Sequence, residues 1–132
     1  MQNSEIVIKT SDFNVLQSLI NNLPQYQRTR EVELLLAEIE KAAKVPDESI
    51  GDDVIQLNSY FEIEECNSKK KYDFTLTLPA MGNIAEKKLS VLTPLGVALI
   101  GYKMGMSVEW QLPGGLRKMN ILKVTQPVLS NQ

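Results

Sequence analysis

The sequence predicts an α+β fold in which an antiparallel helical hairpin, residues 1–46, precedes an antiparallel sheet with one short helix, residues 52–128. Apolar residues recur at helical spacing in the first third of the chain, whereas apolar and polar residues alternate with a period of two in most of the remainder. A break at residues 45–53 that contains proline and glycine separates the two patterns, and we take it as the domain boundary.

The first amphipathic helix is expected over residues 11–22 and ends before Pro24, which cannot continue a helix. Its N-cap candidates are Thr10, Ser11 and Asp12. The apolar run at residues 5–9 is expected to form either a lone strand or a packing segment that precedes the helix.

A second amphipathic helix is expected from Thr29, its N-cap, to about Lys44. Its apolar stripe comprises Val32, Leu35, Leu36, Ile39 and Ala43. Because the loop at residues 23–28 is short, the two helices bury their stripes by folding back on each other as a short coiled coil.

The rest of the chain predicts strands with one buried and one solvated face, which is typical of an antiparallel sheet. The alternating segments are residues 55–58, 61–64, 72–78 and 107–112, and two further strands are expected at 89–92 and 116–124. Residues 66–71 make the turn between the second and third strands. Ile121 and Leu122 interrupt the alternation in the last strand, which predicts a β-bulge there.

One short helix, at residues 94–100, is expected to cover the apolar face of this sheet. Pro94 suits the first helical turn, where a missing N–H costs nothing. Thr93 is its N-cap, and Gly101 ends it. The segment holds apolar and turn residues but no nucleophile, base or metal ligand, which favours binding over catalysis.

Composition restricts the function further. The 132 residues carry a net charge of −2, no histidine and one cysteine, Cys66. The lack of histidine removes the commonest general base and zinc ligand, and a single cysteine forms neither an intrachain disulfide nor a cysteine metal cluster. We therefore expect no catalytic residue, metal or cofactor. The sequence has neither a recognisable signal peptide nor a membrane-length apolar run, so we expect a cytoplasmic protein without membrane contact.

Local charge clusters are interpreted as solvated turns. Lys69–Lys71 form one basic cluster, and Arg117 and Lys118 form a second, but the net charge gives no general attraction to nucleic acid. Acidic pairs occur at residues 47–48, 52–53 and 64–65. Neighbouring residues on a strand point to opposite faces, so the pair at 64–65 does not converge on one metal ion.

Three segments carry a family resemblance. Ser90 begins the pattern Ser-x-x-x-Pro-Leu-Gly-x-Ala-Leu-Ile-Gly, Pro-Gly-Gly follows at residues 113–115, and Asp-Val-Ile-Gln-Leu-Asn-Ser precedes at residues 53–59. Their order and spacing resemble the C-terminal domain of the bacterial Gre transcript cleavage factors over residues 50–127, and most closely the branch of regulators of nucleoside diphosphate kinase (Rnk). The resemblance implies an FKBP-like sheet domain behind a coiled-coil hairpin.

In that family, acidic residues at the tip of a long coiled coil help to hold a catalytic Mg²⁺ in the active site of RNA polymerase. Here the arm is only about 20 Å long, from about 13 residues per helix. Its tip, Gln25, Tyr26, Gln27 and Arg28, contains no Asp or Glu, and Arg28 and Arg30 make it locally positive. We therefore expect a non-catalytic regulator that occupies the secondary-channel entrance and competes with Gre-type factors without stimulating transcript cleavage.

The resemblance also implies a docking segment made of Thr93, Pro94, Leu95 and Gly96, with Gly114 and Gly115 shaping the adjacent loop. Pro94 and Leu95 are expected to form a rigid apolar contact, whereas Leu99 and Ile100 are expected in the core. The expected partner is core RNA polymerase at the rim of its secondary channel. We expect a monomer with no direct sequence-specific nucleic-acid contact.

Two other functions stay open. The family name suggests direct modulation of nucleoside diphosphate kinase. A peptidyl-prolyl isomerase is less favoured, because such a site needs an aromatic-lined pocket and the chain has one Trp, three Phe and four Tyr in all.

Overall fold

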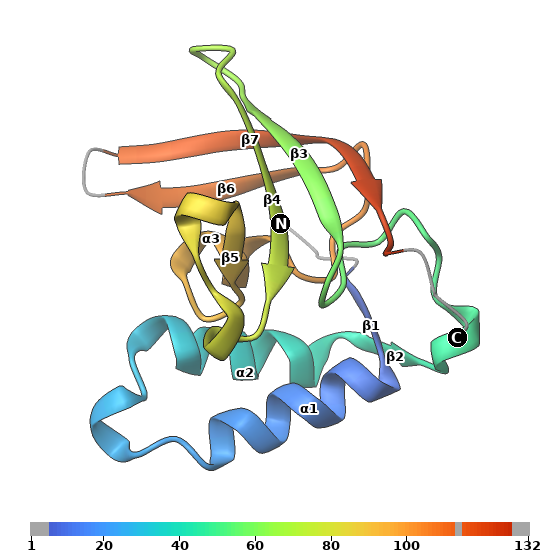
Figure 1. Cartoon of the computed structure of the whole chain (residues 1–132), viewed down its shortest axis with the longest axis vertical. Coiled ribbons are helices and arrows are strands. Elements are labelled where there is room, and N and C mark those ends of the chain that lie inside the picture. Colours follow the sequence, from blue (N-terminus) through green and yellow to red (C-terminus); the bar gives the residue numbers. More distant parts are fainter. Residues whose placement is uncertain (1–5, 113–114, 128–132) are drawn as a thin grey trace.

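The computed structural model describes residues 6–112 and 115–127 of the chain, and it confirms the α+β class. A helical hairpin, α1 and α2, packs beneath a five-stranded sheet that carries one short helix, α3 (Figure 1). Single 3-10 turns occupy Gln25–Gln27, Asp47–Ser49, Pro79–Met81 and Ile84–Glu86. No helix in the described part of the chain is long and apolar enough to cross a membrane.

The hairpin has the predicted form with shifted ends. Helix α1 spans Thr10–Asn21 and helix α2 spans Arg30–Lys41. Thr29 caps α2 as expected, since its side chain accepts a hydrogen bond from the N–H of Val32 at 3.2 Å. The expected end near Lys44 was wrong, because the chain becomes extended at Ala42. As a result Ala42, not Ala43, is buried in the core.

The start of α1 differs from the prediction, because no side chain at its N-cap residue, Lys9, makes a capping hydrogen bond. Instead, the carboxylate of Asp47 accepts a hydrogen bond from the N–H of Ser11 at 3.0 Å. Thr10 Oγ1 donates to the carbonyl of Val45 at 3.0 Å. The segment that follows α2 therefore supplies the cap of α1.

The apolar run before α1 is a strand, but not a lone one. Strand β1, Val7–Lys9, pairs in parallel with β2, Ala43–Val45, in a separate two-stranded sheet. The N–H of Val7 also donates to the carbonyl of Gly101 at 3.1 Å. Strand β1 therefore joins the arm to the chain that follows α3.

The larger sheet has the strand order β5-β4-β3-β7-β6. Its strands are β3 Tyr60–Glu65, β4 Lys71–Thr77, β5 Lys88–Ser90, β6 Ser107–Leu112 and β7 Gly115–Thr125. Neighbouring strands are antiparallel except β4 and β5, which pair in parallel and so depart from the prediction. The connection between them contains two 3-10 turns and returns the chain to Thr75, so that β5 pairs with the last three residues of β4.

The predicted bulge in the last strand is confirmed. Glu62 pairs with Lys123 but Ile63 pairs with Ile121, so Leu122 is the extra residue. The bulge leaves Leu122 exposed while both Ile121 and Val124 reach the core.

The expected strand at residues 55–58 was wrong. Ile55 exchanges backbone hydrogen bonds with residues 101–102, and Asn58 turns the chain with a positive φ of 74°. Residues 54–57 are all buried, including Gln56, whose amide donates to the carbonyls of Gly51 and Val54 at 3.2 and 3.3 Å. The alternation of apolar and polar residues here therefore belongs to a buried loop.

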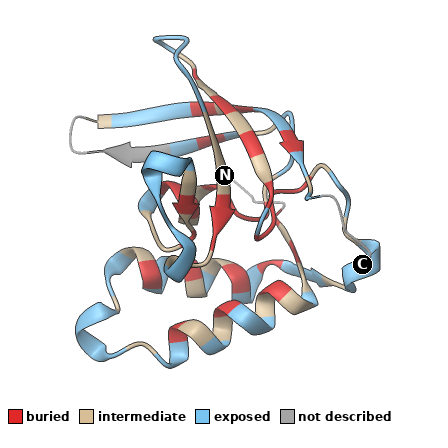
Figure 2. Ribbon diagram, viewed as in Figure 1, coloured by how far each residue is buried: buried red, intermediate tan, exposed pale blue. Residues whose placement is uncertain are grey.

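The hydrophobic core is continuous from the hairpin to the sheet (Figure 2). Leu16, Ile20, Leu35 and Ile39 of the hairpin belong to the same cluster as Phe61, Ile63 and Leu99. Burying these side chains in one core fixes the arm against the sheet domain, since each contributes about 1.5–3 kcal/mol.

Candidate functional site

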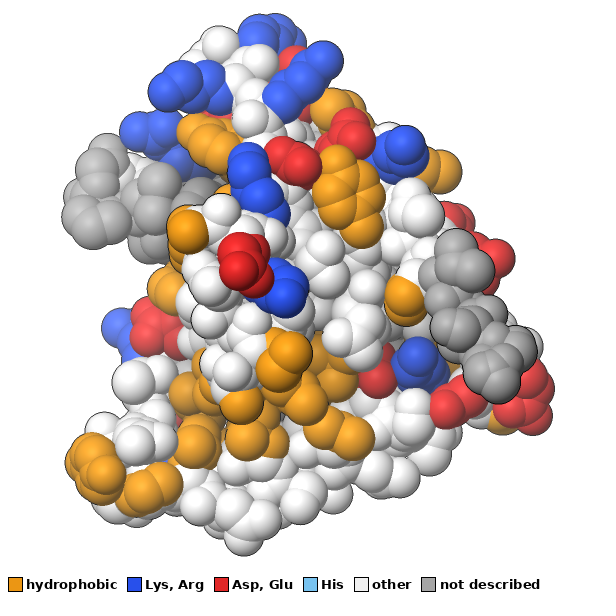
Figure 3. Space-filling view, in the orientation of Figure 1, with side chains coloured by type: hydrophobic (Ala, Val, Ile, Leu, Met, Phe, Trp, Pro, Cys, Tyr) orange, Lys and Arg blue, Asp and Glu red, His pale blue; other side chains and the backbone are white. Residues whose placement is uncertain are grey.

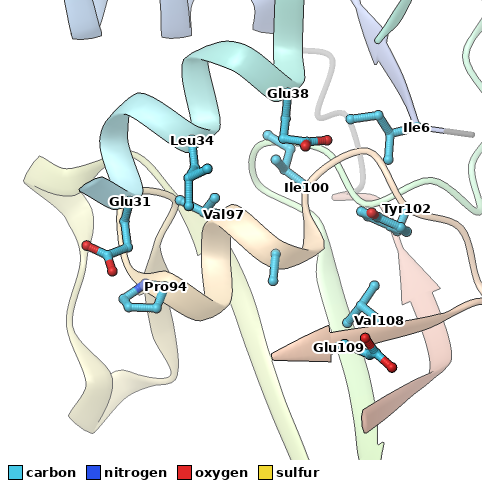
Figure 4. Close-up of a pocket in the computed structure, with 11 residues that line it drawn as sticks. Ile6, Glu31, Leu34, Glu38, Pro94, Val97, Ile100, Tyr102, Val108 and Glu109 are labelled. Atoms are coloured by element: carbon cyan, nitrogen blue, oxygen red, sulfur yellow. The ribbon is translucent and has the colours of Figure 1, made fainter. Parts of the chain in front are cut away.

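A groove of about 290 Å³ lies between α2, α3 and β6. On the face drawn in Figure 3, hydrophobic side chains gather along the seam between the hairpin and the sheet domain. Leu34 and Val97 face each other across the groove, and Glu31 lies beside Pro94 at one end (Figure 4). The groove therefore joins the predicted docking segment to the helical arm.

Helix α3, Pro94–Leu99, begins as its sequence predicts. Thr93 Oγ1 accepts a hydrogen bond from the N–H of Gly96 at 3.1 Å and donates to the carbonyl of Ser90 at 2.7 Å. Pro94 is exposed and lines the groove. Thr93 thus positions the helix, and Pro94 presents a rigid apolar surface.

Leu95 and Gly96 are placed differently from Pro94. Leu95 is only 6% exposed and belongs to the core, so its side chain has little surface to offer as the expected apolar contact. Gly96 is also buried, and a Cβ there would lie 2.4 Å from the carbonyl oxygen of Ser90. Leu95 therefore packs α3 against the core, and Gly96 allows α3 to lie close to the backbone of Ser90 and Val91. The core positions expected for Leu99 and Ile100 are confirmed.

Of the two remaining docking residues, the structure describes Gly115. Gly115, at the start of β7, has a φ of 130° and nothing within 4 Å of a Cβ built on it. It is not among the described residues that line the groove. Gly114 lies outside the described residues.

Three carboxylates, those of Glu31, Glu38 and Glu109, line an otherwise largely apolar groove. Burial raises the pKa of the nearby Tyr102 phenol, and the negative charge of Glu38 raises it further. The Tyr102 phenol is therefore a neutral hydrogen-bond donor beside the negative charge of Glu38. Such a site suits a partner that offers an apolar side chain and a basic one.

The arm tip is the 3-10 turn Gln25–Gln27, in which Tyr26 is 82% exposed. The sequence suggested that Arg28 adds positive charge to the tip. In the structure its charge is paired, because its Nε donates to Glu33 Oε2 at 2.8 Å. The tip is therefore closer to neutral than expected. Glu33 is engaged in that ion pair, and Glu31 lies at the groove.

Sequence reasoning missed the contribution of α2 to this site. Leu34 is 49% exposed, and it lies beside the predicted stripe of buried residues. An apolar residue next to such a stripe is the one signal in the sequence that could have indicated a second contact surface. Glu38 and Glu109 gave no such signal, because the groove they share exists only once α2 and β6 flank α3.

Comparison with known proteins shows which family the chain belongs to. Residues 50–126 match the family described as "Transcription elongation factor, GreA/GreB, C-term". The chain is 30% identical over 116 residues to the "Regulator of nucleoside diphosphate kinase" of Escherichia coli (strain K12), covering 88% of this chain and 85% of that protein. It is 36% identical over 75 residues to the "Transcription elongation factor GreA" of Syntrophus aciditrophicus (strain SB), covering 57% of this chain and 47% of that protein.

Solved structures agree. The "Prokaryotic transcription elongation factor GreA/GreB from Nitrosomonas europaea" has a TM-score of 0.77 and 30% identity, covering 93% of this chain and 99% of that chain. Thermus aquaticus Gfh1, with a TM-score of 0.53 and 15% identity over 93% of this chain and 99% of that one, shares the fold alone. Both the C-terminal sequence and the full-length fold therefore place this chain in the GreA/GreB family of transcription elongation factors.

Proposed function

We propose that the protein is a non-catalytic regulator that binds core RNA polymerase at the secondary-channel entrance and competes there with Gre-type factors without stimulating transcript cleavage. Membership of the GreA/GreB family supports polymerase as the partner. The observation that carries the proposal is the arm: α1 and α2 have 12 residues each, which corresponds to a length of about 18 Å.

The tip of this arm supports the absence of cleavage stimulation. Residues 23–29 contain no Asp or Glu. The nearest carboxylates are engaged elsewhere, since Glu33 binds Arg28 and Glu31 lines the groove. Mg²⁺ is usually held through carboxylates, so an arm of this composition has no means of presenting the ion.

The groove provides the docking surface in this proposal. Pro94 and Leu34 offer apolar contacts from two different helices, and the carboxylates of Glu31 and Glu38 lie beside them. A segment of polymerase with an apolar side chain followed by a basic one fits this arrangement. Thr93, Leu95 and Gly96 act indirectly by holding α3 in place, and Gly114 and Gly115 shape the neighbouring loop.

A competition assay tests the function. Stalled elongation complexes are incubated with a Gre factor and increasing amounts of this protein, and the shortened transcript is quantified. We expect stimulation by the Gre factor to fall as this protein is added, and no cleavage from this protein alone. Cleavage produced by the protein itself, or undiminished Gre activity at saturating protein, contradicts the proposal.

Matched variants test the groove. Pro94→Ala and Leu34→Ala should each raise the half-inhibitory concentration about fivefold, which corresponds to about 1 kcal/mol. Pro46→Ala and Val15→Ala are the controls, because both residues are exposed and lie outside the groove lining. Equal effects of groove and control variants would assign docking to another surface.

The charges of the groove are tested separately. Glu31→Gln combined with Glu38→Gln should weaken competition and reduce its dependence on salt, since a basic partner loses its counter-charges. Glu40→Gln combined with Glu48→Gln removes the same charge from exposed positions outside the groove lining and should have little effect.

The name of the E. coli relative favours direct modulation of nucleoside diphosphate kinase as a second candidate. Kinase activity measured with and without this protein, in the absence of polymerase, distinguishes the two functions. The groove gives less support to a prolyl isomerase, because Tyr102 is the one aromatic residue among the described residues that line it.

A further inference from the structure

The fold brings together two basic segments that are far apart in the sequence. Lys69, Lys70 and Lys71 lie at the turn between β3 and β4, and Arg117 and Lys118 lie near the start of β7. Strand β3 runs between β4 and β7, and the N–H of Cys66 donates to the carbonyl of Lys118 at 2.9 Å. These five residues, here named the basic end, therefore occupy one end of the sheet.

The basic end is solvated and projects from the molecule. All five side chains are exposed, and none forms an ion pair within 4.0 Å among the described residues. The β3–β4 turn extends beyond the other strands (Figure 1), and Lys and Arg side chains gather at that end of the space-filling view (Figure 3). A projecting turn with free ammonium groups can approach an extended surface of opposite charge.

Three carboxylates share this region and reduce its charge. Glu64 is opposite Lys71, and Glu109 is opposite Lys118, in the strand registers. Glu65 is only 4% exposed and points inward, where its Oε1 accepts a hydrogen bond from the N–H of Ser68 at 2.8 Å. Five cations therefore outnumber three carboxylates, one of them buried, at one end of a chain whose net charge is −2.

The chemistry of the cations indicates the partner. Four of the five are lysines, which act as point charges with three rotatable donors and bind phosphate well. Duplex nucleic acid presents a dense, continuous array of phosphate charges, which matches several ammonium groups gathered on one projecting turn.

We propose that the basic end binds the phosphate backbone of duplex nucleic acid without sequence specificity. This binding does not depend on the proposed docking on polymerase, because none of the five residues of the basic end is among the described residues that line the groove, although Glu109 of the groove lies opposite Lys118.

Fluorescence anisotropy with a labelled duplex DNA of random sequence tests the proposal with the full chain. At 50 mM salt we expect binding in the micromolar range. The logarithm of the affinity should fall with the logarithm of the salt concentration with a slope of about −3 to −4, since each phosphate contact contributes about −0.9.

The test variant combines Lys69→Asn, Lys70→Gln and Lys118→Gln. Asn is chosen at position 69 because Lys69 has a positive φ of 66°, which Asn tolerates. We expect this variant to lose at least tenfold in affinity at 50 mM salt and to reduce the steepness of the slope by about 2 to 3.

The control variant combines Arg30→Gln, Lys41→Gln and Lys103→Gln, three exposed cations outside the basic end. Both variants change the net charge equally, so equal losses would show that overall charge alone governs binding and would overturn the proposal. The same conclusion follows if the wild type does not bind at 50 mM salt, or if polyglutamate displaces the DNA as well as unlabelled duplex does. The DNA-binding assay contains no polymerase, so its result does not depend on whether the protein competes with a Gre factor.

Discussion

The carboxylate of Asp12 accepts a hydrogen bond from the backbone N–H of Leu57 at 3.1 Å, and so links the first turn of the arm to the buried loop before β3. Asp12 is 5% exposed, and Lys9 Nζ lies 4.0 Å from its other oxygen. This bond fixes the arm at its base, away from the tip. It is one reason why the hairpin behaves as part of a continuous core.

Asp12→Ala should destabilise the protein by about 1–3 kcal/mol, because the buried N–H of Leu57 loses its acceptor. The free energy of unfolding from urea denaturation, followed by circular dichroism, measures the change. Asn22→Ala, at the exposed C-cap of α1, is a control that should have a smaller effect. Equal stability of Asp12→Ala and wild type would show that water satisfies the Leu57 N–H.

The pH dependence of Asp12 has a definite sign. Burial raises the pKa of its carboxyl above the usual 3.8, although the Leu57 hydrogen bond and Lys9 oppose this. Its favourable contribution is therefore fully present below pH 3.8 and is lost as the pH rises through the raised pKa. Asp12→Asn keeps an acceptor without a charge, so its stability relative to wild type should increase over this window. Unfolding measured between pH 3 and 7 tests the trend.

Asp47 should show the opposite dependence. Its hydrogen bonds from Ser11 lower the pKa of the carboxyl below 3.8, so its contribution is present above pH 3.8 and is lost as the pH falls through the lowered pKa. Asp47→Ala should lower Tm by a few degrees at pH 7, since α1 loses its cap. That difference should shrink in strong acid, and a difference that stayed constant would contradict the role of the ionised carboxylate.

Gly96→Ala should destabilise the protein by about 2–3 kcal/mol. A Cβ at Gly96 would lie 2.4 Å from the Ser90 carbonyl oxygen and 2.9 Å from Val91 Cα, and backbone atoms do not yield easily. Gly105→Ala is the control, because it has a positive φ of 93° but open space around it, and it should cost about 1 kcal/mol. Thermal denaturation of the two variants measures the difference, and equal costs would exclude steric overlap as the reason.

Tyr60 should titrate well above the usual pKa of a tyrosine phenol. Burial, followed by hydrogen bonds with Asp73 and Glu62, raises the pKa of its phenol from 10.0 to about 12. Stability from this group is therefore retained below pH 10 and lost as the pH rises toward 12. Ultraviolet titration of wild type and Tyr60→Phe should show the loss of one high-pH transition. A transition near pH 10 for Tyr60 would contradict the arrangement.

Local signals in the sequence predicted much of the fold correctly. Thr93 and Pro94 start α3, Thr29 caps α2, and Leu122 is the bulged residue in β7. Each feature depends on residues within a few positions of one another, so propensity, capping and periodicity are sufficient to predict it.

Other features depended on contacts between distant segments. Asp47 caps a helix 36 residues away, and Asp12 binds a backbone group 45 residues away. No local pattern predicts such partners. The buried residues 54–57 were mistaken for a strand for the same reason. Ile55 bonds to residues 101–102 and Leu57 bonds to Asp12, so their backbone partners are not on an adjacent strand.

The sequence alone determined the class of the protein, the order of its main elements and the absence of carboxylates from the arm tip, because composition and periodicity are properties of the chain itself. Only the tertiary structure decided which surfaces exist. The groove requires α2, α3 and β6 to meet, and the basic end requires β3 to lie between two basic segments more than forty residues apart. Packing of the apolar core brings these segments together, and a linear sequence does not specify such distances directly.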